Sequence, residues 1–149
     1  MATHQTRRTQ APNAVVVLAQ PERDDRDMYA EYMSHMGLRP VCVQNAQDAI
    51  RIAPKADVIV TELLLPGAFD GYALIEMLKC NPITRTIPLI VLTVCAWTEE
   101  EAQARRAGCD VFLSKPCLPE TLHCNIRCMM ESRVATHSPE RSQVVMRRY

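Results

Sequence analysis

The chain has 149 residues, 48% of them hydrophobic, and its 17 basic residues balance its 17 acidic residues. This length and composition suit one globular domain and exclude a chain that is disordered throughout. A net charge of zero also argues against general electrostatic binding to nucleic acid or to an anionic membrane surface.

The two ends of the chain differ in composition from the part between them. Residues 1–13 and 133–149 are polar and lack hydrophobic periodicity, so we expect flexible tails on either side of a domain at residues 14–132. The first segment has no apolar core of the signal-peptide type, and no apolar run approaches the ~18 residues that cross a bilayer. We therefore expect a cytoplasmic protein with no membrane partner.

The first half of the domain alternates short apolar runs with helical patterns. Ala14–Ala19 is a continuous apolar run, as in a strand covered on both faces. Asp25–Met36 has apolar residues at helical spacing and is followed by Gly37, a residue typical of the position after a helix. Pro40–Val43 is predicted as a strand, and Asn45–Ala53 as a helix whose first residue is a good N-cap.

The second half of the domain continues this alternation. Three further strands are predicted at Asp57–Glu62, Pro88–Thr93 and Cys109–Leu113. Three further helices are predicted at Asp70–Cys80, Thr98–Ala107 and Leu118–Glu131. Thr98 and Glu101 have the spacing of a capping box, and Gly108 follows as a C-terminal residue of the same helix.

Five strands that alternate with five helices predict an α/β fold with a parallel sheet and right-handed crossovers. Its apolar strands need helices on both faces, and the flavodoxin-like, doubly wound sheet of strand order 2-1-3-4-5 provides them. Function in such a sheet concentrates at the carboxyl ends of the strands. A carboxylate at Glu62, a hydroxyl at Thr93 and an ammonium at Lys115 are therefore predicted to converge there.

Three segments near these ends resemble a known family. They are DVIVTELLLPGAFDG at 57–71, IPLIVLT at 87–93 and AGCDVFLSKP at 107–116. Together they resemble the receiver domain of two-component response regulators, over about residues 14–132.

This resemblance implies a role for each matching residue. Glu62 stands at the phosphoacceptor position, which is normally Asp, and Thr93 at the position of the hydroxyl that contacts the phosphoryl group. Lys115, followed by Pro116, matches the invariant lysine of the family. Phe112 matches the aromatic switch position, although it is alternatively a simple core aromatic.

The chain departs from the family where an acidic pair normally holds Mg²⁺ for phosphorylation. Gln20 and Pro21 fall at those positions, with Glu22 as the one nearby acid. Magnesium prefers carboxylate oxygens, so a neutral amide and a proline are poor replacements. The acids at positions 24 and 25 look like cap residues of the first helix.

These departures predict a degenerate member of the family, a pseudo-receiver. Loss of the metal removes the charge that phosphoryl transfer requires, and the extra methylene of Glu62 displaces the nucleophilic oxygen. We therefore expect a protein that is not an enzyme and that has no metal and no other cofactor. The alternative is a phospho-accepting response regulator that uses Mg²⁺ with an unusual acceptor.

Glu62 has two interpretations in a pseudo-receiver. It forms with Thr93 and Lys115 a fixed polar network that holds one conformation without phosphate, or it merely pairs with Lys115 and no switch survives. An ion pair of this kind has a gross Coulomb energy of about 4 kcal/mol at ~4 Å and an effective dielectric constant near 20, before desolvation.

A stand-alone pseudo-receiver is expected to act through a protein partner, which is a signalling kinase, an output protein or a second copy of the chain. Receivers usually use the face formed by the fourth helix, the fifth strand and the fifth helix. The candidate residues on this face are Trp97, Arg105, Arg106, Val111 and His123. Trp97 is a partner anchor or packs over its own loop.

Two minor alternatives concern cysteines and arginines. We expect the seven cysteines to be small buried hydrophobic residues in a reducing cytosol. The alternative is a metal or redox site formed by His123, Cys124 and Cys128. Nucleic-acid binding is not expected, although the C-terminal tail carries three arginines, at 141, 147 and 148.

Overall fold

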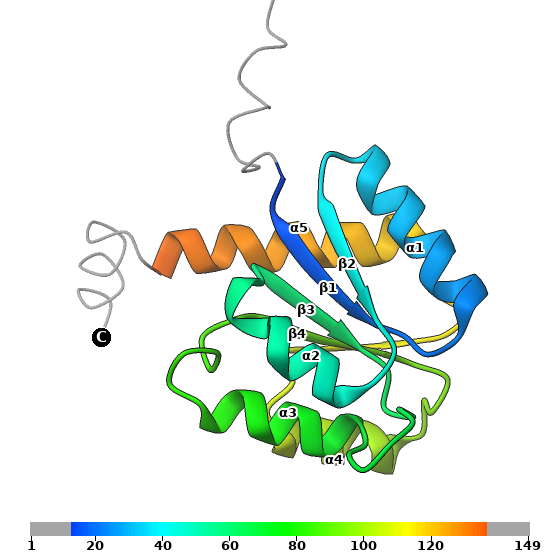
Figure 1. The fold of residues 1–149 in the computed structure, drawn as a ribbon, viewed down its shortest axis with the longest axis vertical. Helices are drawn as coiled ribbons and strands as arrows, with labels where there is room; N and C mark the ends of the chain where they lie inside the picture. The colour runs from blue at the N-terminus through cyan, green and yellow to red at the C-terminus, as the bar shows by residue number, and fades with distance from the viewer. Residues whose placement is uncertain (1–12, 137–149) are drawn as a thin grey trace, which may run out of the picture.

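The computed structural model describes residues 13–136, which form an alternating series of strands and helices (Figure 1). The strands are β1 (Val15–Ala19), β2 (Arg39–Val43), β3 (Val58–Thr61), β4 (Leu89–Thr93) and β5 (Val111–Ser114). The helices are α1 (Arg23–His35), α2 (Ala46–Ile52), α3 (Gly71–Cys80), α4 (Thr98–Ala107) and α5 (Pro119–Thr136), with a short 3₁₀ turn, η1 (Ala53–Lys55), after α2.

The five strands form one parallel sheet in the order β2-β1-β3-β4-β5, which confirms the predicted fold. Helices α1 and α5 cover one face of the sheet, and α2, α3 and α4 cover the other (Figure 1). Alternate residues of a strand therefore enter different halves of the core. In β1, for example, Val17 packs towards α2–α4 and Leu18 towards α1 and α5.

The ends of the helices show where local sequence signals hold and where they fail. Asn45 caps α2 as predicted, because its side chain accepts a hydrogen bond from the Asp48 amide. The predicted capping box of α4 is wrong: Trp97 is the N-cap residue, Thr98 already lies in the helix, and Glu101 pairs with Arg105.

The termini of the predicted domain also shift. Helix α5 continues to Thr136, so residues 133–136 belong to a helix and not to a tail. At the other end, the Asn13 amide donates a hydrogen bond to the Gly37 carbonyl. The remaining predicted tails, 1–12 and 137–149, lie outside the described residues. Between residues 13 and 136, no helix is both long enough and apolar enough to span a membrane.

One glycine fixes the distance between α3 and the end of β3. A Cβ atom on Gly71 would lie 2.4 Å from the Glu62 carbonyl oxygen and 2.6 Å from the Leu63 Cα, too close for any other residue. The Gly71 amide also donates to the Leu63 carbonyl at 2.8 Å. Helix α3 therefore begins directly against the two residues that follow β3.

Candidate functional site

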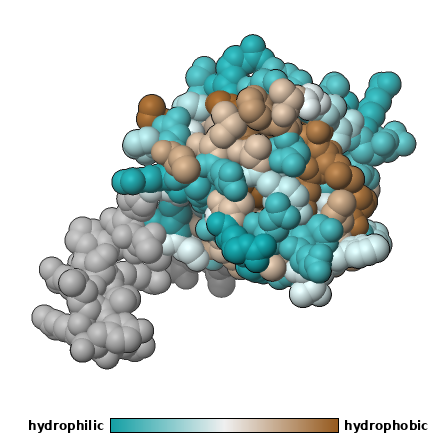
Figure 2. Space-filling view, turned by 90° about the horizontal axis from the view of Figure 1, so that it is seen from below, coloured by the Kyte–Doolittle hydropathy of each residue, from teal (hydrophilic) through white to brown (hydrophobic). Residues whose placement is uncertain are grey.

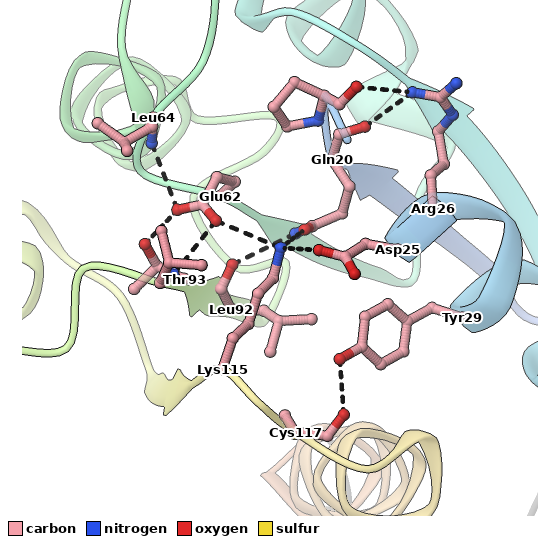
Figure 3. Close-up of polar contacts among 12 residues, drawn as sticks. Gln20, Asp25, Arg26, Tyr29, Glu62, Leu64, Leu92, Thr93, Lys115 and Cys117 are labelled. Carbon is pink, nitrogen blue, oxygen red and sulfur yellow. Dashed lines mark hydrogen bonds and ion pairs between the residues drawn. The ribbon is translucent and has the colours of Figure 1, made fainter. Parts of the chain in front are cut away.

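The predicted site residues meet at the carboxyl ends of the strands (Figure 3). Gln20 follows β1, Glu62 follows β3, Thr93 ends β4 and Lys115 follows β5. All four side chains point into one polar cluster between the loops. The predicted convergence of Glu62, Thr93 and Lys115 is therefore confirmed, and Gln20 joins them from the loop after β1.

The Glu62 carboxylate is almost completely enclosed, with 4% of the residue exposed. Oε1 accepts hydrogen bonds from the Thr93 hydroxyl, from the Leu63 amide at 2.7 Å and from the Leu64 amide at 3.4 Å. Oε2 accepts from the Val94 amide at 3.4 Å and lies 3.3 Å from Lys115 Nζ. Both oxygens are thus held by groups at the carboxyl ends of β3, β4 and β5.

The Lys115 ammonium is surrounded by three oxygen atoms. Nζ lies 2.7 Å from Gln20 Oε1, 2.7 Å from Asp25 Oδ2 and 3.3 Å from Glu62 Oε2. An ammonium group has three protons to donate, so these three acceptors satisfy it completely. Its side chain is only 9% exposed, which leaves little room for a further ligand.

Asp25 is the member of this cluster that the sequence interpretation missed. It is not a cap residue, because α1 begins at Arg23 and Glu22 is the N-cap. Asp25 lies in the first turn, four residues before Tyr29, and therefore on the same inward face of α1. That spacing was the available signal, since Tyr29 is one of the apolar residues at helical spacing in the predicted helix Asp25–Met36.

The loop after β1 replaces the expected acidic pair with neutral groups. Gln20 is fully buried, and its Nε2 donates to the Leu92 carbonyl at 3.4 Å. Arg26 Nη1 donates to the carbonyls of Gln20 and Pro21 at 3.0 and 3.3 Å, which fixes the loop. Glu22, the nearest acid in the sequence, is exposed, and among the described residues its side chain makes no hydrogen bond or ion pair with the cluster.

A second contact ties α1 to the loop after β5. The Tyr29 hydroxyl donates to the Cys117 carbonyl oxygen at 2.6 Å, one helical turn beyond Asp25 (Figure 3). Burial, with smaller contributions from the nearby Cys117 and Asp25, raises the pKa of Tyr29 to about 12. The phenol therefore stays protonated and keeps donating throughout the neutral range.

Residues 16–127 match the family described as the response regulator receiver domain. The chain belongs to this family. Receiver domains are signalling modules of two-component systems that interact with other proteins, so the predicted family and its general role are confirmed.

Relatives of known identity support this assignment. The phosphate regulon regulatory protein PhoB of Klebsiella pneumoniae is 27% identical over 117 residues, which cover 77% of this chain and 51% of the relative. The probable transcriptional regulator ycf29 of Porphyra purpurea is 33% identical over 94 residues, or 62% of this chain and 44% of the relative. The chain thus spans about half the length of these curated relatives.

Solved structures show the same fold. The signal receiver domain of a histidine kinase from Syntrophus aciditrophicus has a TM-score of 0.73 and 26% identity, covering 80% of this chain and 91% of that one. The receiver domain of a sensor histidine kinase from Pseudomonas aeruginosa, with a magnesium ion in its active-site cleft, has a TM-score of 0.73 and 22% identity, covering 79% and 98%. The second likeness supports the fold alone.

The receiver fold implies a magnesium site, and the donor set in this chain does not fit one. Magnesium requires several hard oxygen ligands at ~2.1 Å in octahedral geometry. Here the oxygens of Gln20, Asp25 and Glu62 converge on the Lys115 ammonium instead. A divalent cation would have to displace a positive charge that these oxygens already neutralise.

The residues predicted at switch positions, Phe112 and Pro116, lie in β5 and in the loop after it. Phe112 is partly buried and packs against the half of the core under α2–α4. Pro116 is exposed and follows a cis peptide bond after Lys115. Trp97 is 69% exposed, so the interpretation that it packs over its own loop is wrong.

The predicted partner face is only partly a surface. Arg105 and Arg106 are exposed, whereas Val111 is half-buried against the core. His123 is wrongly assigned to this face: it is only 4% exposed and its ring packs edge-on against Tyr32. Burial, and to a lesser extent the charge of Arg127, lowers the pKa of His123.

The prediction of buried cysteines is also wrong for most of them. Only Cys109 is buried; Cys95 and Cys117 are intermediate, and Cys42, Cys80, Cys124 and Cys128 are exposed. Because His123 faces the core while its two neighbouring thiols face solvent, the three do not form a ligand cluster. No group of three potential metal ligands occurs among residues 13–136. The arginines at 141, 147 and 148 lie outside the described residues.

Proposed function

We propose that this receiver domain acts in signal transduction as a pseudo-receiver, through protein–protein interaction that does not depend on phosphorylation. The observation that supports this most directly is the position of the Lys115 ammonium between Glu62, Asp25 and Gln20. The lysine itself is shared with the family, but Gln20 and Pro21 replace the acidic pair beside it, and the oxygens that remain converge on its ammonium group. Its partner is a kinase, an output protein or a second copy of the chain.

The state of Glu62 also argues against phosphoryl transfer. A nucleophilic carboxylate needs a lone pair directed at the incoming phosphorus and a metal that neutralises the developing charge. In this chain Oε1 already accepts from the Thr93 hydroxyl and the Leu63 amide, and Oε2 already faces Lys115. The attack would have to break several charge-assisted hydrogen bonds first.

The same contacts support the interpretation that Glu62 holds one fixed conformation. By family resemblance, Thr93 is the hydroxyl that contacts the phosphoryl group and Lys115 is the invariant lysine, and here both contact the Glu62 carboxylate. The longer side chain of glutamate, compared with aspartate, brings its oxygens within reach of both. A signal that leaves this domain therefore depends on its surface.

Phosphorylation with a small donor tests the proposal. The full chain is incubated with acetyl phosphate and Mg²⁺, and the intact mass is measured, with a conventional receiver domain alongside to show that the reagents work. We expect no phosphoryl adduct on this chain. A variant that restores the family's acids, Gln20→Asp/Pro21→Asp/Glu62→Asp, is the matched comparison and is expected to gain an adduct.

The contrary result is specific. A Mg²⁺-dependent adduct on the unmodified chain that disappears in Glu62→Gln would establish the alternative, a phospho-accepting regulator with a glutamate acceptor. An adduct that persists in Glu62→Gln would place the acceptor elsewhere and would equally overturn the proposal.

A further inference from the structure

Five exposed hydrophobic side chains gather above the closed polar cluster. They lie in the loops after β3, β4 and β5 and we call them the apolar rim: Leu64, Phe69, Val94, Trp97 and Leu118. Figure 2 shows strongly hydrophobic surface on the right-hand side of the molecule, the side towards which the strands run in Figure 1.

The backbone contacts show that the rim is one region. The amides of Leu64 and Val94 both donate to the Glu62 carboxylate, so these two residues flank it from adjacent loops. Leu118 lies three residues after Lys115, which contacts the same carboxylate. The polar groups of the cluster beneath the rim already bind one another. The exposed apolar side chains therefore have no ligand in that pocket to enclose.

Exposed acids surround the rim. All five helices begin at this end of the sheet, and acidic residues in a first turn are stabilised by the helix dipole. The exposed acids at these helix starts are Glu22, Asp24, Asp70, Glu99 and Glu120. Basic residues occupy the last turns at the opposite end: Arg51, Lys79, Arg105, Arg106 and Arg133.

A complementary segment exists in the same chain. Residues 13–136 carry sixteen acidic and twelve basic side chains, so the two terminal segments supply the positive charge that brings the whole chain to zero. In the C-terminal segment Arg141, Arg147 and Arg148 flank the apolar run Val144–Met146. The N-terminal segment has a pair of arginines, at 7 and 8, but no such apolar run.

We propose that residues 141–148 of one copy dock on the apolar rim of a second copy. The apolar run covers the rim around Trp97, and the arginines face the surrounding acids. This contact joins two copies because α5, with 18 residues, is about 27 Å long and leads away from the rim. The eight residue steps from Thr136 to Val144 span at most about 29 Å, so the apolar run reaches its own rim only if the connecting segment is fully extended along α5, a constraint that a second copy removes.

Charge reversal in the full-length chain tests the proposal. Sedimentation over a concentration series gives the self-association constant, and the fluorescence of Trp97, the single tryptophan, reports burial at the rim. We expect Arg147→Glu/Arg148→Glu to weaken association by about tenfold or more, and to shift Trp97 emission to that of an exposed indole. The matched control Arg7→Glu/Arg8→Glu changes the net charge equally and is expected to leave both readings unchanged.

The reciprocal variant identifies the docking site. Glu99→Lys/Glu120→Lys is expected to weaken association similarly, and its combination with Arg147→Glu/Arg148→Glu to restore it to within about threefold of the unmodified chain. Three results would overturn the proposal: a chain that stays monomeric at every concentration, an equal effect of the control, or no restoration in the combined variant. None of them bears on the metal or phosphorylation experiments.

Discussion

Two lysine–aspartate ion pairs lie at opposite ends of the same sheet and differ in what surrounds them. At the amino end, Lys79 Nζ lies 3.1 Å from Asp110 Oδ2 and also donates to the carbonyls of Arg85 and Ile87. At the carboxyl end, Lys115 Nζ faces two carboxylates, those of Asp25 and Glu62, and an amide oxygen. Both ammonium groups have three acceptors, but only the second has more negative charge around it than it can neutralise.

The difference separates an ion pair that fixes a turn from a polar cluster at the carboxyl ends of the strands. The amino-end pair fixes a turn, since Asp110 Oδ2 also accepts from the Leu89 amide at the start of β4. The carboxyl-end cluster joins four loops that otherwise have no reason to hold buried charge. The buried charges are stable there because each charged or polar side chain of the cluster binds the others. Removing one of these side chains leaves the others without a partner.

The largest expected effect comes from removing each lysine in turn. Lys115→Met leaves the enclosed Glu62 and the neighbouring Asp25 without a counter-charge, and we expect a loss of about 3 kcal/mol in the free energy of unfolding. Lys79→Met, at the more exposed pair, is the control and should lose only about 1 kcal/mol. Urea denaturation measures both, and equal losses would erase the distinction between the two ends.

A buried hydroxyl at each end sharpens the comparison. The Thr93 hydroxyl donates to the Glu62 carboxylate and accepts from the Cys95 amide, so Thr93→Val should cost about 2 kcal/mol. Thr84 is equally buried at the other end, but its hydroxyl makes one neutral bond, to the Leu78 carbonyl, so Thr84→Val should cost about 1 kcal/mol. Thermal or urea unfolding that ranks them in the reverse order would contradict the account.

Alkaline titration probes the second tie between α1 and the loop after β5. Folding raises the pKa of Tyr29 from 10.0 to about 12, so its contribution is complete below pH 10 and is lost as pH rises towards 12. The unmodified chain should therefore lose stability more steeply over this interval than Tyr29→Phe. Parallel unfolding curves at several pH values measure the difference, and identical slopes would exclude a buried, bonded phenol.

The smallest effect is expected on the acidic side, from the buried histidine between α1 and α5. Burial lowers the pKa of His123 below 6.5, so its neutral form favours folding above that pH and the contribution is lost as pH falls. His123→Phe, which keeps an aromatic contact with Tyr32, should flatten this acidic loss. An unchanged acid profile would place His123 in solvent, as the original assignment to a partner surface required.

The fold and most of the site could be predicted from the sequence because both depend on regular patterns. Apolar runs fixed the strands, and the topology then brought Gln20, Glu62, Thr93 and Lys115 to one place. The role of Asp25 was not predicted because it depends on the exact start of α1. No capping signal marks that start, since Glu22 makes no side-chain capping bond. A two-residue error in a helix start turns an inward side chain into an apparent cap.

The surface could be predicted less well because residue type alone does not set burial. Cys124 and Cys128 are apolar by type but lie on the outer side of α5, whereas His123 lies on its inner side with Leu122 and Ile126. Trp97 extends into solvent because it precedes α4 as the N-cap residue. The position of a residue around its helix, or the direction of its loop, therefore determines whether these side chains are buried.

Titration with Mg²⁺ tests most directly whether the Lys115 ammonium takes the place of a divalent cation. Calorimetry on the unmodified chain should show no saturable binding, because the oxygens of Gln20, Asp25 and Glu62 already hold a positive charge. Lys115→Met frees the same oxygens and should bind Mg²⁺ and gain thermal stability from it. Saturable binding to the unmodified chain, as tight as to Lys115→Met or tighter, would contradict the account.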